Sequence, residues 1–273
     1  MDELTDLDVA LAMADAADAY TLPRFEAADF TLGWKDDRTE VTEADRGAES
    51  LLAELALHHR PESAFFGEEH GLQGRADSPW RWIVDPIDGT SGFVRGIPVW
   101  ATLIALTHAE HGVTIGVVSA PALGRRWWAA TGQGSFANGR RCQVSDVSSI
   151  ADAQVCVTFN DGWDHLGLTP NLVALLQQAR RARGFGDFWQ HCLVAEGAVD
   201  VAIDAVGVKP YDIAAVRLVV EEAGGTFTDR FGTVTHESDT AVSSNGRLHD
   251  TVIAALRRAP TTRSGSDQGV SSQ

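Results

Sequence analysis

Residues 82–90 read Trp82-Ile83-Val84-Asp85-Pro86-Ile87-Asp88-Gly89-Thr90, an apolar segment followed by two carboxylates. The apolar residues predict a short strand that ends at Asp85, and a turn containing proline brings Asp88 close to it three residues later. Gly89 allows the backbone to approach a ligand closely, and Thr90 adds a hydroxyl group. Two ionised carboxylates this close repel each other unless a cation lies beside them. Because Mg²⁺ binds carboxylates together with substrate phosphate oxygens, the segment predicts a magnesium site.

An aspartate-rich turn that merely ends a strand is the alternative interpretation of this segment. The upstream stretch Gly67-Glu68-Glu69 adds further carboxylates and favours the metal site. Zinc is not expected, because the nine histidines are scattered and the three cysteines form no C-x-x-C pair.

The segments on either side of this motif predict a helical pair followed by a largely antiparallel sheet. Helical spacing predicts a helix over residues 4–19, with Leu4, Leu7, Leu11 and Ala14 on its apolar face. A hairpin loop is expected over residues 33–40, and Thr42-Glu43-Ala44-Asp45 resembles a capping box that begins a second helix. After the motif, strands are predicted over residues 99–108, 113–119, 127–130 and 134–136.

The second half of the chain alternates between strands and helices. Strands are predicted over residues 155–159, 199–203 and 225–228, and helices over residues 169–180, 188–196 and 212–223. We therefore predict an α/β fold with mixed sheets. Its N-terminal α+β part covers residues 1–145, its smaller C-terminal α/β part covers residues 146–259, and a polar, flexible tail covers residues 260–273.

The charge of the chain limits its partners. It has 22 Lys and Arg residues against 38 Asp and Glu residues, which gives a formal net charge of −16. This charge repels polyanions, so neither nucleic acid nor an anionic membrane is expected as a partner, whereas a small phosphorylated molecule remains possible beside local cations. We also expect a cytoplasmic protein, because the N-terminus lacks the pattern of a signal peptide and the odd number of cysteines indicates no disulfide framework.

Five segments resemble, in order and spacing, the motifs of the inositol monophosphatase superfamily. They are Val41-Thr42-Glu43-Ala44-Asp45, Gly67-Glu68-Glu69, Asp85-Pro86-Ile87-Asp88-Gly89-Thr90, Tyr211-Asp212-Ile213-Ala214-Ala215 and Glu222-Ala223-Gly224-Gly225. Within the superfamily the chain is most similar to bacterial histidinol-phosphate phosphatases, through residues 93–100, residues 121–130 and Gly186-Asp187-Phe188. The resemblance implies a layered α-β-α-β-α sugar-phosphatase fold, a homodimer, and hydrolysis of a phosphomonoester by metal-activated water without a covalent intermediate.

The resemblance also implies roles for individual residues. Glu68, Asp85 and the Ile87 carbonyl would hold one Mg²⁺, and Asp85, Asp88 and Asp212 would hold a second, while a third ion near Glu68 is left open. The residues expected to be catalytic are Thr90, Asp45 and Glu68, of which Thr90 and Asp45 orient the attacking water. The residues expected to contact or select the substrate are Ile87, Asp88, Gly89, Thr90, Ser91, Asp187, Asp204 and Asp212.

Several of these residues have a second possible role. Helix capping is an alternative for Asp45, Asp187 and Asp212, and for Asp45 it is compatible with orienting water. Glu69 is expected to support the ligands rather than bind metal. Lys35 resembles a family lysine near the metals, although a solvated loop lysine is the alternative.

The leading substrate is L-histidinol phosphate, but residues around the metal motif depart from the family pattern. Thr90-Ser91-Gly92-Phe93 replaces a Thr-Lys-Asn-Phe or Thr-Thr-Asn-Phe stretch, and Asp204 is one residue further from Asp212 than the corresponding acid usually is. An inositol, sugar or nucleoside phosphate, including one of specialised metabolism, is the alternative substrate. A non-catalytic homologue that binds metal or phosphate and scaffolds a partner is the alternative from another class.

Overall fold

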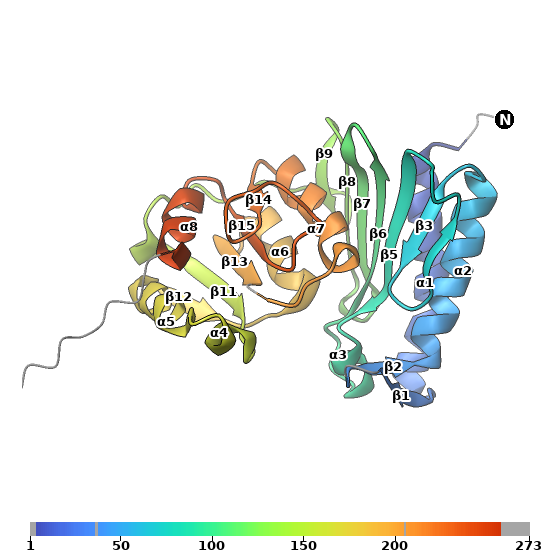
Figure 1. The fold of residues 1–273 in the computed structure, drawn as a ribbon, viewed down its shortest axis with the longest axis horizontal. Coiled ribbons are helices and arrows are strands. Elements are labelled where there is room, and N and C mark those ends of the chain that lie inside the picture. Colours follow the sequence, from blue (N-terminus) through green and yellow to red (C-terminus); the bar gives the residue numbers. More distant parts are fainter. Residues whose placement is uncertain (1–3, 36–37, 205, 258–273) are drawn as a thin grey trace, which may run out of the picture.

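The computed structural model describes residues 4–35, 38–204 and 206–257. The tail predicted over residues 260–273 lies outside the described residues. The chain forms five layers (Figure 1): an outer helical pair, an eight-stranded sheet, two central helices, a five-stranded sheet and an outer group of helices. This confirms the predicted layered α/β architecture. Within the described residues, none of the helices combines the length and the apolar character that crossing a membrane requires.

The outer pair consists of α1 (Asp6–Ala27) and α2 (Glu43–His59), joined through the hairpin of β1 (Leu32–Trp34) and β2 (Glu40–Thr42). Thr42 is the N-cap of α2 and forms the predicted capping box with Asp45. Three residues of the apolar face predicted for α1 pack onto the rest of the protein: Ala14 is buried, and Leu7 and Leu11 are partly buried against the same core cluster. Leu4, the fourth, precedes the helix and is 63% exposed. The prediction missed Val9, Ala10, Met13 and Ala17, which are buried on the same helix. The small alanine side chains let α1 approach α2 and the sheet closely.

The large sheet has the strand order β10-β9-β8-β7-β6-β5-β3-β4. Its strands are β3 (Ala64–Gly67), β4 (Gly71–Gly74), β5 (Trp80–Asp88), β6 (Ala101–His108), β7 (Gly112–Ala120), β8 (Arg125–Ala130), β9 (Gly134–Ala137) and β10 (Arg140–Arg141). The pairings are antiparallel except for β3 with β5, as the sequence largely predicted. β5 continues beyond its predicted end, and its pairing with β6 becomes irregular between Asp85 and Asp88. This irregularity places both carboxylates at the point where regular pairing stops.

The smaller sheet has the strand order β12-β11-β13-β15-β14. Its strands are β11 (Gln154–Thr158), β12 (Arg181–Arg183), β13 (Val201–Asp204), β14 (Thr226–Thr228) and β15 (Ala241–Ser244). β11 pairs parallel with β12 and β13, whereas β15 pairs antiparallel with β13 and β14. Its outer side carries α4 (Gly162–His165), α5 (Thr169–Gln178) and α8 (His249–Arg257). We propose a division of the chain near residue 145, because the first sheet ends at Arg141 and the second begins at Gln154.

The two central helices, α6 (Asp187–Ala195) and α7 (Pro210–Glu222), lie between the sheets (Figure 1). One apolar cluster joins Leu103 and Trp127 of the large sheet to Phe188 of α6, Val216 of α7 and Ala202 of the smaller sheet. α7 crosses the large sheet so closely that a Cβ added at Gly116 would lie 2.5 Å from the Ala215 carbonyl oxygen. This packing fixes the first turns of α6 and α7 beside the end of β5, and the candidate site forms there.

Candidate active site

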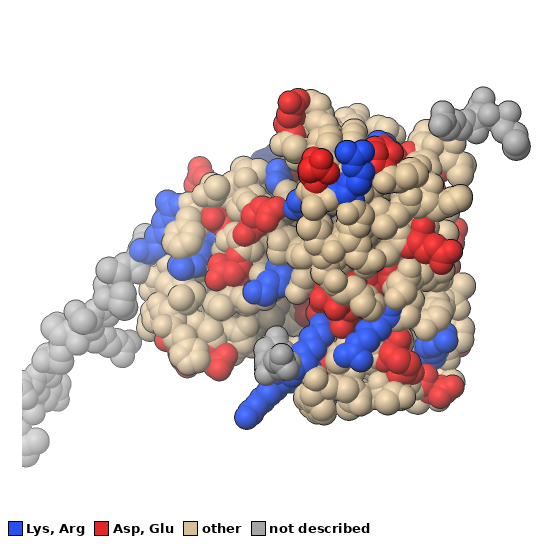
Figure 2. Space-filling model, turned by 45° about the vertical axis from the view of Figure 1, so that its right-hand side comes forward, with Lys and Arg blue, Asp and Glu red and all other residues tan. Residues whose placement is uncertain are grey.

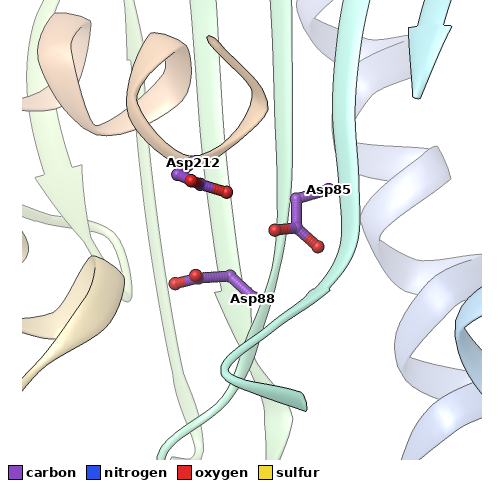
Figure 3. Close-up of side chains that lie close together, drawn as sticks. All are labelled: Asp85, Asp88 and Asp212. Atoms are coloured by element: carbon purple, nitrogen blue, oxygen red, sulfur yellow. The ribbon is translucent and has the colours of Figure 1, made fainter. Parts of the chain in front are cut away.

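Three carboxylates from distant parts of the sequence converge where β5 ends (Figure 3). Asp85 and Asp88 come from β5 and Asp212 comes from the first turn of α7, and one oxygen of each lies within 4.8 Å of the others. Burial is the largest cause of raised pKa values in all three groups, and it raises the pKa of Asp212 to about 7. The neighbouring carboxylates raise the pKa values of Asp85 and Asp88 further. Such a donor set is suited to a hard divalent cation, which relieves both the desolvation and the repulsion.

Each of the three carboxylates is oriented by a backbone N–H group. Asp85 Oδ1 accepts a hydrogen bond of 2.9 Å from Ile87, within its own turn. Asp88 Oδ2 accepts one of 2.8 Å from Phe188, in the first turn of α6. Asp212 Oδ2 accepts one of 2.7 Å from Lys209. Lys209 is the N-cap of α7, so the simple N-cap alternative for Asp212 was wrong: Asp212 occupies the third helical position and binds back to the cap.

Glu68, another predicted ligand, lies directly after β3 and is not one of the three converging acids. Lys35 Nζ is 2.6 Å from Glu68 Oε1 and 2.6 Å from Glu69 Oε1. Burial is the main cause that raises the pKa of Glu68, and Lys35 works against it. The Glu68 charge in turn contributes to the raised pKa of Asp85, so the two carboxylates are electrostatic neighbours. Lys35 therefore belongs to the acidic site, and the alternative of a solvated loop lysine was wrong.

Thr90 and Asp45 are in direct contact, as expected for a pair that orients water. Thr90 Oγ1 lies 3.0 Å from Asp45 Oδ1 and 3.1 Å from the Ile87 carbonyl oxygen. The other oxygen of Asp45 accepts hydrogen bonds from the Thr42 N–H at 2.8 Å and from Thr42 Oγ1 at 2.6 Å. Asp45 is completely buried, and burial raises its pKa. Capping of α2 and contact with Thr90 therefore coexist on the two oxygens of one carboxylate.

The chain turns sharply at Gly89, which precedes the short helix α3 (Thr90–Val94). Gly89 has a φ of 86°, a left-handed conformation that other residues rarely adopt. A Cβ at this position would lie 2.9 Å from the Val99 carbonyl oxygen and 3.4 Å from Asp187 Oδ2. Glycine is therefore required here for two reasons. The exposed residue Ser91 follows, and its Oγ accepts a hydrogen bond of 2.5 Å from Arg95 Nη1.

Two cavities meet at Asp212 and Gly207 and differ in the charges that line them. The first has a volume of about 480 Å³, and its lining includes Thr90, Ser91, the basic residues Lys35, Arg38 and Lys209, and the acidic residues Glu40, Glu68 and Asp212. The second has a volume of about 230 Å³, and its lining includes Asp88, Asp187, Asp204, His191, Asn160 and Asp212. Figure 2 shows a hollow on one face of the molecule in which acidic side chains lie beside basic ones. A ligand that spans both cavities would meet basic side chains only in the first, because neither Lys nor Arg lines the second.

Asp187 lies in the second cavity with an unusual backbone conformation. Its φ is 48°, a left-handed value that is uncommon for a residue other than glycine. Gly186 is the N-cap of α6, and no side chain caps this helix, so the capping alternative for Asp187 was wrong. Burial and the nearby charge of Asp204 raise the pKa of Asp187 to about 6. A cavity-lining carboxylate with a strained backbone and a raised pKa indicates a functional position, although the residue as a whole is exposed.

Sequence reasoning missed two buried polar residues that support the site. Glu49 is fully buried in α2, and its carboxylate accepts the backbone N–H groups of Glu69 at 2.7 Å and His70 at 2.8 Å. His191, on α6, is 1% exposed and hydrogen-bonds Asp204. Both could have been found from helical spacing, because Glu49 lies four residues after Asp45 and His191 lies four residues after Asp187.

Comparisons with known proteins agree with this geometry. A model of the inositol monophosphatase family matches residues 1–261. A histidinol-phosphatase of Streptomyces coelicolor is 44% identical over 265 residues, covering 94% of this chain and 98% of the relative. One of Mycobacterium tuberculosis is 46% identical over 261 residues, covering 92% and 97%. The solved structure of the extragenic suppressor protein suhB of Bartonella henselae has a TM-score of 0.85 at 28% identity, covering 92% and 98%. The chain therefore belongs to the inositol monophosphatase family and is a phosphoric monoester hydrolase.

Proposed function

We propose that this enzyme is a Mg²⁺-dependent phosphatase that hydrolyses L-histidinol phosphate to L-histidinol and inorganic phosphate. The family is metal-dependent and acts on small phosphorylated substrates. The observation that supports the proposal most strongly is the convergence of Asp85, Asp88 and Asp212 beside two cavities, one lined by both basic and acidic side chains and the other by acidic ones without Lys or Arg. A phosphate ester whose alcohol part is cationic has the matching distribution of charge.

In this proposal two Mg²⁺ ions are held by the acidic cluster. Glu68, Asp85 and the Ile87 carbonyl oxygen would hold one ion, and Asp85, Asp88 and Asp212 would hold the other, with Asp85 shared. The raised pKa values of the aspartates support this assignment, because a bound cation favours their ionised forms. When bound, the metals would lower the pKa of a coordinated water and neutralise charge that develops on the phosphate oxygens. A third ion near Glu68 stays open.

The remaining residues would orient the water and the phosphate. The Thr90 hydroxyl, held by Asp45, is placed to accept a hydrogen bond from the attacking water while it donates to the carboxylate. Glu68 would help to hold the same water. Backbone N–H groups of Gly89 and Thr90 would bind phosphate oxygens, and Lys35 and Lys209 in the wall of the first cavity would attract the dianion.

The second cavity would bind the alcohol part of the substrate. The ammonium and imidazole groups of L-histidinol phosphate need anionic or hydrogen-bonding partners, and the cavity is lined by the buried carboxylate of Asp204 and by that of the exposed residue Asp187. Asp187 Oδ2 also lies near Gly89, so the alcohol subsite adjoins the phosphate subsite. Ser91, on the exposed rim of the first cavity, is a further candidate for substrate contact.

Two alternatives remain as outcomes of the test. An inositol, sugar or nucleoside phosphate would be favoured as the substrate if esters with an uncharged alcohol part turned over faster than L-histidinol phosphate, whose alcohol part is cationic. Relatives named fructose-1,6-bisphosphatase/inositol-1-monophosphatase are 30% and 35% identical to this chain. The two histidinol-phosphatases reported above are more similar to it, at 44% and 46% identity. The intact contact between Thr90 and Asp45 argues against a non-catalytic scaffold. We also propose a cytoplasmic homodimer, in agreement with three free, buried cysteines and the family resemblance, and light scattering in solution would test the dimer.

Phosphate release from a panel of substrates tests the proposal. The panel contains L-histidinol phosphate, inositol 1-phosphate, a sugar phosphate and a nucleoside monophosphate, each with Mg²⁺ and with EDTA. We expect the highest kcat/KM for L-histidinol phosphate and no turnover in EDTA. Asp212→Asn should be inactive, whereas the exposed Asp250→Asn, on the distant helix α8, serves as the matched control and should behave like the parent. A higher kcat/KM for an ester with an uncharged alcohol part would overturn the proposed substrate, and turnover in EDTA would overturn the proposed mechanism.

A further inference from the structure

A histidine that none of the proposed catalytic steps uses forms the floor of the acidic cavity. His191 and Asp187 lie one turn apart on α6, so both face the same side of that helix. Asp204, at the end of β13, faces them across the cavity. We propose that His191 is a positioning residue for substrate selection: it holds the Asp204 carboxylate as an oriented anion that receives the cationic part of the substrate. This inference rests on the proposed function and extends it.

The hydrogen bonds of His191 fix both ring nitrogens. Nε2 is 2.7 Å from Asp204 Oδ2, and Nδ1 is 2.7 Å from Ser243 Oγ. The Ser243 hydroxyl can donate to Nδ1, which places the ring hydrogen on Nε2, where it is donated to the carboxylate. The opposite neutral tautomer would direct the lone pair of Nε2 at Asp204 and is disfavoured. Ser243 itself is anchored in β15, which pairs with β13 through Ala202.

The surroundings of Asp204 explain why it needs this donor. Asp204 is 6% exposed and shares its cavity with Asp187 and Asp88, so few groups are available to donate to it. The hydrogen bond from His191 supplies a donor and fixes the rotation of the carboxylate. The ring of His191 in turn packs against that of Phe227, with 5.6 Å between the ring centroids. His191 thus sets the direction of a group proposed to contact substrate, without contacting the reacting phosphate.

Two substitutions at this position separate positioning from packing. His191→Met keeps a side chain of similar size but removes the donor, whereas the amide of His191→Gln can still donate to Asp204. We expect the KM for L-histidinol phosphate to rise roughly 10-fold or more in His191→Met, as for loss of a hydrogen bond to a charged group. The KM for inositol 1-phosphate, which carries no cation, should change by less than about threefold. His191→Gln should restore most of the preference.

Each outcome decides the inference. Equal losses on both substrates, or an unchanged preference in a folded His191→Met, would mean that His191 is only structural. If His191→Met does not fold, Ser243→Ala provides the second test, because the ring then loses the partner that holds its Nδ1. A reduced preference in Ser243→Ala supports positioning, and an unchanged preference contradicts it. A parent enzyme that hydrolyses only phosphate esters of uncharged alcohols would overturn the proposed substrate itself, and this result would be recognised before any variant is made.

Discussion

The hydroxyl group of Thr90 has one hydrogen and two acceptors within reach, Asp45 Oδ1 and the Ile87 carbonyl oxygen. Because the chain buries Asp45 completely, this contact is fixed before any substrate binds. Thr90→Ala should lower kcat by about 10²–10³-fold, within the range for lost acid–base assistance, and should leave the Mg²⁺ concentration for half-maximal rate nearly unchanged. Thr90→Ser keeps the hydroxyl and is the matched control. A kcat within about threefold of the parent in Thr90→Ala would remove Thr90 from the mechanism.

Asp187 is the second residue whose chemistry can be isolated. Asparagine is the informative replacement, because it tolerates the left-handed backbone of this position better than alanine does. Asp187→Asn should cost ~1–3 kcal/mol in the binding of L-histidinol phosphate, the range for a charge-assisted hydrogen bond. A phosphomonoester whose alcohol part is uncharged should lose much less, and the Mg²⁺ concentration for half-maximal rate should not change. Comparison of kcat/KM for the two substrates measures this, and equal losses would assign Asp187 a structural role.

At the scale of elements, α2 supports the turn that follows β3. Glu49 accepts two backbone N–H groups of that turn, and a Cβ at Gly67 would lie 2.2 Å from the Glu49 carboxyl carbon, so no other residue fits there without displacement. Glu49→Gln replaces one acceptor oxygen with a donor and should destabilise the protein by ~1–3 kcal/mol.

The same change should disturb Glu68, which the turn presents to the metal cluster. We expect Glu49→Gln to raise the Mg²⁺ concentration for half-maximal rate several-fold. Glu54→Gln, an exposed change on the same helix, is the matched control and should alter neither quantity. Thermal unfolding and Mg²⁺ titration of the rate provide the two measurements, and a Mg²⁺ requirement equal to that of the parent would contradict this supporting role.

The parts that sequence reasoning located correctly are those in which the signal is local. The strand and the turn that bring Asp85 and Asp88 together follow from nine consecutive residues, and the capping box at Thr42 follows from four. The apolar face of α1 was located only in part, because Ala10 and Ala17 are buried by the neighbours they approach, which the spacing of the leucines does not indicate. Helical spacing places Glu49 on the face of Asp45 and His191 on the face of Asp187, but it does not identify their partners, which lie 20 and 13 residues away and are brought close only by tertiary structure.

The proximity of Asp212 to Asp85 was expected only from the family resemblance, because a separation of 127 residues along the chain does not by itself predict a contact. The structure shows how it happens: α7 crosses the large sheet at Gly116 and directs its first turn at the end of β5. Asp88 completes the junction, because it accepts the Phe188 N–H from α6. The turn from Asp85 to Asp88 therefore takes part both in the candidate active site and in the contact between the two halves of the molecule.

At the scale of the whole molecule, the acidic cluster links stability to pH and to metal. Without metal, the pKa of Asp212 is about 7 in the folded state, and those of Asp85 and Asp88 are also raised, whereas the unfolded chain has ordinary values near 3.8. Between pH 3.8 and about pH 7 the folded state binds more protons than the unfolded chain, so the free energy of unfolding falls as the pH rises. The melting temperature in EDTA should therefore be higher at about pH 6.5 than at about pH 8.

Saturating Mg²⁺ should remove this trend and raise the melting temperature most at about pH 8, where the carboxylates are ionised and repel each other. Below about pH 6.5, His236 and His249 oppose the trend because burial lowers their pKa values, so the comparison stops there. Asp85→Asn should flatten the pH dependence in EDTA and weaken the stabilisation by Mg²⁺. A melting temperature in EDTA that increases toward about pH 8 would show that the cluster is not under the predicted electrostatic stress.

The most direct measurement is anomalous diffraction from crystals soaked in Mn²⁺, which replaces Mg²⁺ and can be located unambiguously. We predict anomalous peaks between Asp85, Asp88 and Asp212, with Asp85 bridging and metal–oxygen distances of roughly 2.1–2.2 Å. Phosphate included in the soak should contact the same ions and the Gly89–Thr90 backbone. Peaks that leave Asp212 without a metal, or no peak at the three carboxylates in an enzyme that is active in the same Mn²⁺, would contradict the assignment of this cluster as the catalytic centre.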